Sequence, residues 1–254
     1  MPGHTASSPA ADRQTVIVLM TAAMALTVQE YCFNFSNLAW CVEQLSALGR
    51  SDLATSWSDW IRRAENAEIA RLSWWAVGRL LTYVLLPMVV VKLLLRQPLG
   101  DLGLHVRGIG RSLPLYLLLL ALILPAVWYF SRTPHFQQTY PFYELLPGEA
   151  LWPRFWIWEL LYALQFVSLE FFFRGFMVHG TKHALGRASI YVMMLPYVML
   201  HFTKPMPETL GAIGAGVILG HLSFKTCSIW WGAGLHIAVA WTMDLLALWH
   251  RGLI

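Results

Sequence analysis

Long apolar runs, separated by short polar segments, make up most of this chain and predict helices that cross a membrane. A span needs about 20 predominantly apolar residues, because each residue adds about 1.5 Å along the helix axis. We expect about seven spans, of which the first is short. The expected spans cover residues 15–28, 74–95, 113–130, 155–184, 189–201, 209–224 and 228–249.

Polar stretches interrupt this pattern near the N-terminus. Residues 1–14 are small and polar, so we expect a disordered tail there. The first apolar run could also be the core of a signal peptide, but no convincing small-residue cleavage site follows it, which favours a retained span. The segment 58–72, SDWIRRAENAEIARL, mixes apolar and charged positions and predicts an amphipathic helix that lies along the bilayer surface.

The composition supports a membrane protein. Hydrophobic residues make up 57% of the 254 residues and charged residues only 13%, whereas about 25% charged residues is usual in soluble domains. The expected fold class is therefore all-α, a polytopic transmembrane helical bundle of about seven spans with an interfacial amphipathic helix. We expect one compact membrane domain, in which residues 15–150 hold the N-terminal spans and residues 151–254 form the core that carries the chemistry.

The net charge of +4 is best explained by membrane topology. Short cytoplasmic loops collect Lys and Arg. Arg96, Arg107 and Arg111 fall in one such expected loop, and Arg187 and Lys225 fall in two others. We therefore expect an integral protein of the cell membrane with a cytoplasmic N-terminus, in contact with membrane lipids and without a nucleic-acid partner.

The stretch SLEFFFRGF, residues 168–176, places Glu170 and Arg174 one helical turn apart in very apolar sequence. Ionisable groups at membrane depth usually face the bundle interior or a water-filled cavity. Counting about 1.5 Å per residue from the expected loops places Glu170 and His201 at similar depths, about 21 and 18 Å, and His236 at about 12 Å, so these residues and Arg174 can share one pocket inside the membrane. Glu170 and Arg174 could equally form an ion pair that neutralises two buried charges.

Three short motifs follow one another along residues 155–250: EFFFRG at 170–175, YVMLH at 197–201 and HIAVA at 236–240. In their order and spacing they resemble the motifs of the CPBP family of intramembrane proteases, also called the CAAX-protease and bacteriocin-processing or Abi family. The family pattern is Glu-Glu-x-x-x-Arg, then an aromatic residue ahead of a His, then His-x-x-x-Asn or a similar residue. The resemblance implies a helical membrane protease.

The resemblance also implies roles for individual positions. Glu170 matches the second Glu of the first motif, and Arg174 matches its Arg. His201 and His236 match the two histidines of the family's catalytic site. Tyr197 stands at the aromatic position of the second motif and is a supporting candidate.

Two positions depart from the family pattern. The first Glu, which in the family is the usual water-activating carboxylate, is Leu169 here, and the Asn of the last motif is Ala240. Other acids could supply the missing carboxylate. Glu208 follows His201 after two prolines and could fold back towards it, although it could also be an ordinary capping acid of the next helix. Asp244, on the last span, is a second supporting candidate.

Peptide hydrolysis needs a base that takes a proton from water and groups that stabilise the oxyanion. Glu170 could replace the missing base. His201 and His236 could hold the water, donate to the oxyanion, or ligate a divalent metal such as zinc. Activation of water by a glutamate without a metal is at least as compatible with the sequence, so the sequence assigns no definite cofactor.

The expected function is that of an intramembrane endopeptidase. It would hydrolyse a peptide bond of a membrane-associated or lipidated protein with a water activated by glutamate and histidine. Two alternatives stay open from the sequence. One is a catalytically inactive relative that binds a membrane partner or peptide, and the other is a membrane acyl or group transferase that uses the same pocket.

Overall fold

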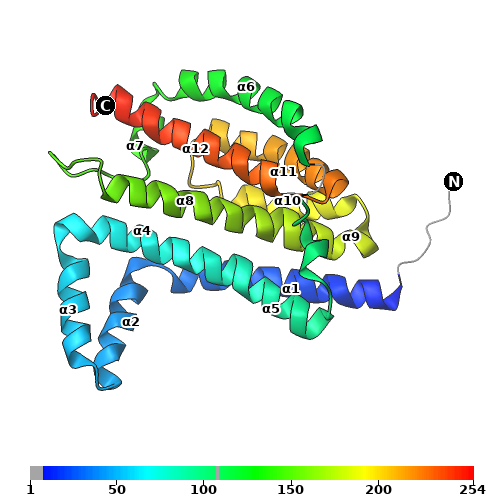
Figure 1. Ribbon diagram of the computed structural model, residues 1–254, viewed down its shortest axis with the longest axis horizontal. Helices are drawn as coiled ribbons and strands as arrows, with labels where there is room; N and C mark the ends of the chain where they lie inside the picture. The colour runs from blue at the N-terminus through cyan, green and yellow to red at the C-terminus, as the bar shows by residue number, and fades with distance from the viewer. Residues whose placement is uncertain (1–7, 107–108) are drawn as a thin grey trace.

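The computed structural model describes residues 8–106 and 109–254, and this part of the chain forms a helical bundle (Figure 1). The first half contains α1 (Pro9–Cys32), α2 (Phe35–Ala47), α3 (Ser51–Arg62), α4 (Ala64–Leu80), η1 (Leu81–Leu85), α5 (Leu86–Val90), η2 (Val91–Leu95), η3 (Leu99–Leu102), η4 (Ile109–Ser112) and α6 (Leu113–Phe130). The second half contains α7 (Pro134–Thr139), α8 (Arg154–Glu170), η5 (Phe171–His179), α9 (Gly180–Leu185), α10 (Ala188–Met199), α11 (Met206–Thr226) and α12 (Trp230–His250).

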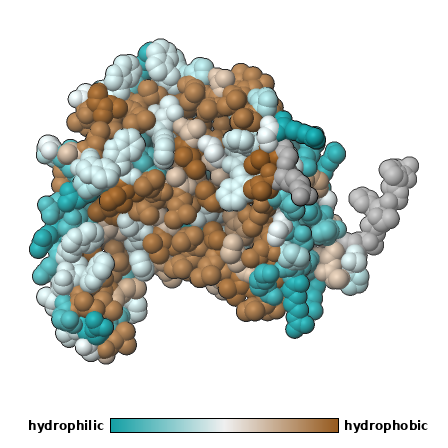
Figure 2. All heavy atoms as spheres, in the orientation of Figure 1, coloured by the Kyte–Doolittle hydropathy of each residue, from teal (hydrophilic) through white to brown (hydrophobic). Residues whose placement is uncertain are grey.

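Five helical stretches of the described chain are long and apolar enough to cross a membrane. Hydrophobic residues cover the middle of the face shown in Figure 2, and hydrophilic residues gather towards its two sides, where the helices end. The predicted fold class, a polytopic helical membrane bundle, is confirmed. The count of seven spans stays a prediction. The five stretches are Pro9–Cys32, Ala64–Leu95, Ile109–Phe130, Arg154–Leu185 and Trp230–His250.

Helix α1 begins earlier than the apolar pattern indicates. The side chain of Ser8 accepts a hydrogen bond from the backbone N–H of Ala11, and Pro9 occupies the first turn. Both features favour a helix start. Residues 9–14, expected in the disordered tail, are therefore helical, while residues 1–7 of that tail lie outside the described residues.

The segment expected to be one interfacial helix is divided between two helices. The backbone of Arg63 is extended (φ −66°, ψ 132°), so α3 ends before it and α4 begins after it. Helices α2 and α3 form a hairpin that projects from the bundle (Figure 1). Ile61 and Leu72, from the two parts of this segment, are 2% and 0% exposed, because each packs into a hydrophobic cluster.

The helix that carries the first motif runs without a break from Arg154 to Leu185, but it widens into the π-helix η5 directly after Glu170. π-Helical turns are uncommon and often lie at functional sites. The apolar residues of η5 anchor it in the largest hydrophobic core, where Phe172 stacks on Tyr83 with 4.4 Å between the ring centroids. The position of Glu170 along the bundle is thereby fixed by packing on its C-terminal side.

Close packing of α10 and α11 follows from glycines in α11. A Cβ atom on Gly216 would lie 2.8 Å from Met194 Cγ, and one on Gly220 would lie 2.7 Å from Ile190 Cγ2. Both distances are too short for a larger side chain, so these glycines allow the two helix backbones to approach each other. This contact holds α10, and with it Tyr197, against the interior of the bundle.

Candidate active site

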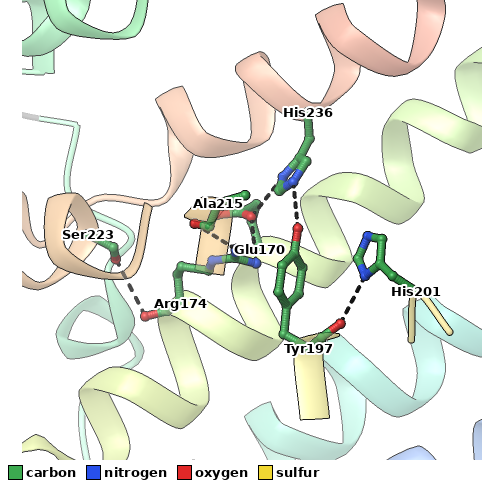
Figure 3. Close-up of polar contacts among 7 residues, drawn as sticks. All are labelled: Glu170, Arg174, Tyr197, His201, Ala215, Ser223 and His236. Atoms are coloured by element: carbon green, nitrogen blue, oxygen red, sulfur yellow. Dashed lines mark hydrogen bonds and ion pairs between the residues drawn. The ribbon is translucent and has the colours of Figure 1, made fainter. Parts of the chain in front are cut away.

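The first and third motifs meet inside the bundle (Figure 3). Nη1 of Arg174 and Nδ1 of His236 lie 3.0 and 2.9 Å from the same carboxylate oxygen, Oε1 of Glu170. The side chains of Glu170 and Arg174 are 1% and 0% exposed, whereas that of His236 is 17% exposed. The ion pair that the sequence allowed is therefore present, and a histidine from another helix joins it.

The guanidinium of Arg174 has further partners that hold it in place. Nη2 donates to the backbone carbonyl of Ala215 (3.4 Å), and the guanidinium carbon Cζ lies 4.0 Å from the centroid of the Tyr197 ring. The hydroxyl of Ser223 donates to the backbone carbonyl of Arg174 (3.4 Å). A buried charge is tolerated when a counter-charge and polar or aromatic partners surround it. Arg174 is therefore tied to α8, α10 and α11 at once.

Gly232 leaves room for the Glu170 carboxylate on α12. A Cβ atom at this position would lie 2.6 Å from Oε2 of Glu170, closer than any ordinary contact. Gly232 is one helical turn before His236, so both residues are on the face of α12 that meets α8. The sequence motifs do not single out Gly232 as a site residue. The signal available was a glycine four residues before the histidine of the third motif.

The imidazole of His236 is held on three sides. Its Nδ1 faces Glu170, its Nε2 lies 2.9 Å from the hydroxyl oxygen of Tyr197, and its ring stacks on Phe166 with 5.5 Å between centroids. A carboxylate accepts a proton-bearing nitrogen, so Nδ1 carries the hydrogen and the Tyr197 hydroxyl donates to Nε2 when the ring is neutral. Glu170, His236 and Tyr197 are therefore connected in sequence, by an ion pair and then by a hydrogen bond.

His201 joins these residues through Tyr197 rather than through Glu170. Helix α10 ends at Met199, so His201 lies in the following turn and not on the helix that its spacing predicted. The Oγ1 of Thr209 donates to the backbone carbonyl of His201 (2.6 Å) and fixes that turn. The Nδ1 of His201 donates to the backbone carbonyl of Tyr197 (3.0 Å), which leaves Nε2 as the ring nitrogen that can accept a proton.

The two supporting carboxylates from the sequence bind a loop segment. Both carboxylate oxygens of Glu208 lie 2.9 Å from the hydroxyl of Tyr140, which donates to this group. Oδ1 of Asp244 accepts the backbone N–H of Phe142 at 3.0 Å. These acids therefore anchor the segment around residues 140–142. Among the described residues, neither acid forms a hydrogen bond or ion pair with His201 or His236.

A lysine belongs to this loop anchor as well. The Nζ of Lys204 donates to the hydroxyl of Tyr140 (3.3 Å) and lies 4.1 Å from the centroid of the Phe142 ring. Burial lowers the pKa of Lys204 and raises the pKa of Tyr140.

The position of the first Glu in the family motif is Leu169 here. Its side chain is buried in the hydrophobic core, so this position supplies no carboxylate to the site.

A divalent metal such as zinc was one candidate cofactor for His201 and His236. Catalytic zinc sites use three protein ligands. Within residues 8–106 and 109–254, no three His, Cys, Asp or Glu side chains come together in a way that could hold a metal ion. Both ring nitrogens of His236 already face protein groups. The described residues therefore do not fit such a site.

A family model described as Rce1-like, type II CAAX prenyl endopeptidase Rce1-like, matches residues 151–242. No curated protein matches the chain. No solved structure matches it either. The matched region starts just before α8 and ends within α12, so it includes Glu170, Tyr197, His201 and His236. Over residues 151–242, this integral membrane protein is thus similar to the Rce1-like CAAX-type proteases, as its three motifs indicated.

Proposed function

We propose that this chain is an intramembrane endopeptidase that hydrolyses a peptide bond of a membrane-associated protein. The observation that carries the proposal is the contact of His236 with Glu170 on one side and with Tyr197 on the other. A buried carboxylate that fixes the tautomer of a histidine is a recurring element of hydrolytic sites. The family match, which names a prenyl endopeptidase, supports the same reaction class.

In this proposal Glu170 is a positioning residue. Its Oε1 is already engaged by Arg174 and His236, and its side chain is 1% exposed, so a water molecule has little access to it. The carboxylate of Glu170 instead fixes the orientation of the His236 ring through Nδ1. The sequence left the choice between base and ion pair open, and the contacts favour the ion pair with an added orienting role.

His201 is the proposed general base. Its Nδ1 hydrogen is committed to the Tyr197 carbonyl, so Nε2 accepts a proton from the attacking water while the water oxygen bonds to the peptide carbonyl carbon. The tetrahedral intermediate then collapses, the carbon–nitrogen bond breaks, and Nε2 returns the proton to the leaving amine. No electron acceptor or additional reactant is needed.

Tyr197 is the proposed donor to the oxyanion. The hydroxyl of Tyr197 lies 2.9 Å from Nε2 of His236, and its hydrogen turns from this nitrogen to the substrate as negative charge develops on the carbonyl oxygen. Arg174, beneath the Tyr197 ring, adds positive potential on the same side. Donors that are already oriented before charge develops supply a large part of catalysis in such sites.

The test uses the purified full chain in lipid nanodiscs with three reporter peptides. One ends in a farnesylated CAAX sequence, the second is the same peptide without the lipid, and the third is a membrane-anchored leader peptide. Intact-mass measurement of each peptide detects shortening. We expect cleavage of at least one membrane-associated reporter, and loss of cleavage in His201→Ala and Glu170→Gln.

His221→Ala is the matched control, because His221 lies in α11 and its Nδ1 also bonds to a backbone carbonyl, that of Val217. Cleavage that persists in His201→Ala would refute the proposed base. A reporter that gains mass without being shortened would indicate a transferase. Reporters that bind but keep their mass in both wild type and variants would support the inactive binding protein.

A further inference from the structure

A cavity with polar walls lies outside the candidate active site, between the start of α6 and the turn that joins α11 to α12. Its volume is about 210 Å³, and its lining includes Arg111, Ser112, Tyr116, Thr226, Ser228 and Trp231. Pockets for drug-sized ligands usually hold about 300–1,000 Å³. The smaller volume suits a compact polar group.

The walls of this cavity offer positive charge and hydrogen-bond donors. Among the described residues, no acidic side chain lies within ion-pair distance of Arg111. Ser228 is 6% exposed, and its hydroxyl has no hydrogen-bond partner although it is buried. Buried hydroxyls are usually paired, so an unpaired one that lines a cavity indicates a missing partner.

The rest of this end of the bundle is also basic. The start of α1, which carries Arg13, and α9, which carries Lys182, lie at the same side of the bundle as the start of α6 (Figure 1). Basic membrane-proximal surfaces attract anionic lipid head groups. The ligand that fits these walls is therefore anionic.

Helix α6 continues from the cavity as an apolar surface. Only 11% of the apolar stretch of this helix is buried inside the bundle. Leu115, Leu118 and Leu122 are 42%, 55% and 66% exposed on its outer side. A head group held at Arg111 would place acyl chains along this surface. A soluble anion would gain nothing from it, so the apolar helix favours a lipid as the source of the anionic group.

We infer that this cavity binds the phosphate of an anionic phospholipid, with its acyl chains lying along α6. Arg111 pairs with the phosphate, the hydroxyls of Ser112 and Ser228 donate to its oxygens, and Trp231 closes one wall. The indole of Trp231 is held there by its hydrogen bond to the backbone carbonyl of Ile109 (2.7 Å).

The test measures lipid retention by native mass spectrometry of the full chain, released from nanodiscs of phosphatidylglycerol or phosphatidylcholine. We expect selective retention of phosphatidylglycerol by the wild type. Arg111→Gln should lower that retention about tenfold, because it removes a charge-assisted hydrogen bond, and Ser228→Ala should lower it several-fold. Arg132→Gln is the matched control, because Arg132 lies beyond the opposite end of α6, against Trp128.

Further arms distinguish other ligands. Equal retention in Arg111→Gln and wild type overturns the inference. If inorganic phosphate binds and the lipid shows no preference over phosphatidylcholine, the ligand is free phosphate and the lipid inference fails. If a peptide with a free C-terminus displaces the lipid and its C-terminal amide does not, the cavity is a peptide subsite and the inference is equally overturned.

Discussion

The carboxylate of Glu170 occupies the space that a side chain at Gly232 would fill. The two residues come from α8 and α12, and the distance from Oε2 of Glu170 to the position of a Gly232 Cβ atom is 2.6 Å. His236 lies one turn further along α12 and contacts the other carboxylate oxygen. The absence of a side chain at one position therefore sets how closely the first and third motifs approach each other.

Gly232→Ala should separate these motifs. The added methyl group pushes the carboxylate from its place, and a displacement of about 1 Å at such a site can cost about 10²-fold in rate. We expect that loss of peptide cleavage together with a decrease of about 1–3 kcal/mol in the free energy of unfolding, as for other overpacked cores. Reporter cleavage and denaturant titration measure the two effects.

Gly234→Ala is the control on the same helix. A Cβ atom there would meet only Trp231 Cε3, at 3.9 Å, which is an ordinary contact. We expect unchanged activity and slightly higher stability, because Ala is favoured over Gly inside a helix by about 0.5–1 kcal/mol. Equal activity of the two variants would show that the Gly232 contact is unimportant for the reaction.

Variants of the buried ion pair between Glu170 and Arg174 should distinguish its effect on stability from its effect on activity. Glu170→Gln leaves the charge of Arg174 unpaired inside the bundle, which should lower the free energy of unfolding by about 3–5 kcal/mol. The double variant Glu170→Met with Arg174→Met removes both charges and should recover most of that stability, yet it should stay inactive because His236 loses its orienting carboxylate. Thermal unfolding in detergent and reporter cleavage together check this.

An exposed ion pair provides the comparison. Arg62 and Glu43 lie 3.0 Å apart with side chains 64% and 54% exposed, so breaking this pair by Glu43→Gln should change stability by less than about 1 kcal/mol. A double variant of Glu170 and Arg174 that regains both stability and cleavage would contradict the proposed role of Glu170.

The sequence predicts most of the architecture, because the apolar runs that can span a membrane are long and contain few charged residues. It predicts the continuous helix around residues 155–184 to within one residue at each end. It places the boundary at Arg63 poorly, since this break depends on how two apolar faces pack against different clusters rather than on a turn residue. The π-helix after Glu170 has no reliable signal in a run of three phenylalanines.

The candidate site is partly predictable for the same reason. Depth counted along ideal helices brings Glu170 and His201 to similar levels and places His236 about 9 Å nearer the cytoplasmic helix ends. The structure instead brings Nδ1 of His236 to 2.9 Å from Oε1 of Glu170. Counting residues along a helix gives the depth of a side chain but does not show which neighbouring helix it faces. Glu208 and Asp244 have suitable chemistry, but hydrogen bonds to Tyr140 and Phe142 commit them to a loop whose course the spacing does not reveal.

Tyr197→Phe should affect catalysis more than folding. It removes one hydroxyl and keeps the ring that packs over Arg174, so stability should fall by about 1 kcal/mol or less. If the hydroxyl donates to the oxyanion, kcat should fall about 10²-fold with little change in KM. A purely structural role would instead leave kcat within a few-fold of wild type, which steady-state kinetics on the cleaved reporter would reveal.

Treatment with a metal chelator tests whether His201 and His236 act as metal ligands. The described residues supply no three-ligand metal site around His201 and His236, and the proposed reaction uses the two histidines as proton donors and acceptors. Overnight dialysis against a strong zinc chelator should therefore leave reporter cleavage unchanged. Loss of activity that returns with added zinc would reassign both histidines as ligands and overturn the proposed base.

The orientation of the bundle gives the final prediction. Arg187 lies between α9 and α10, and Lys225 lies at the end of α11, at the same side of the bundle as the start of α1. Because short cytoplasmic loops retain Lys and Arg, reporter fusions after these two residues should both be cytoplasmic, and a fusion in the loop near Glu149 should be external. An external signal after Lys225 would mean that α11 and α12 do not cross as a pair, and the level shared by Glu170 and His236 would then need another membrane placement.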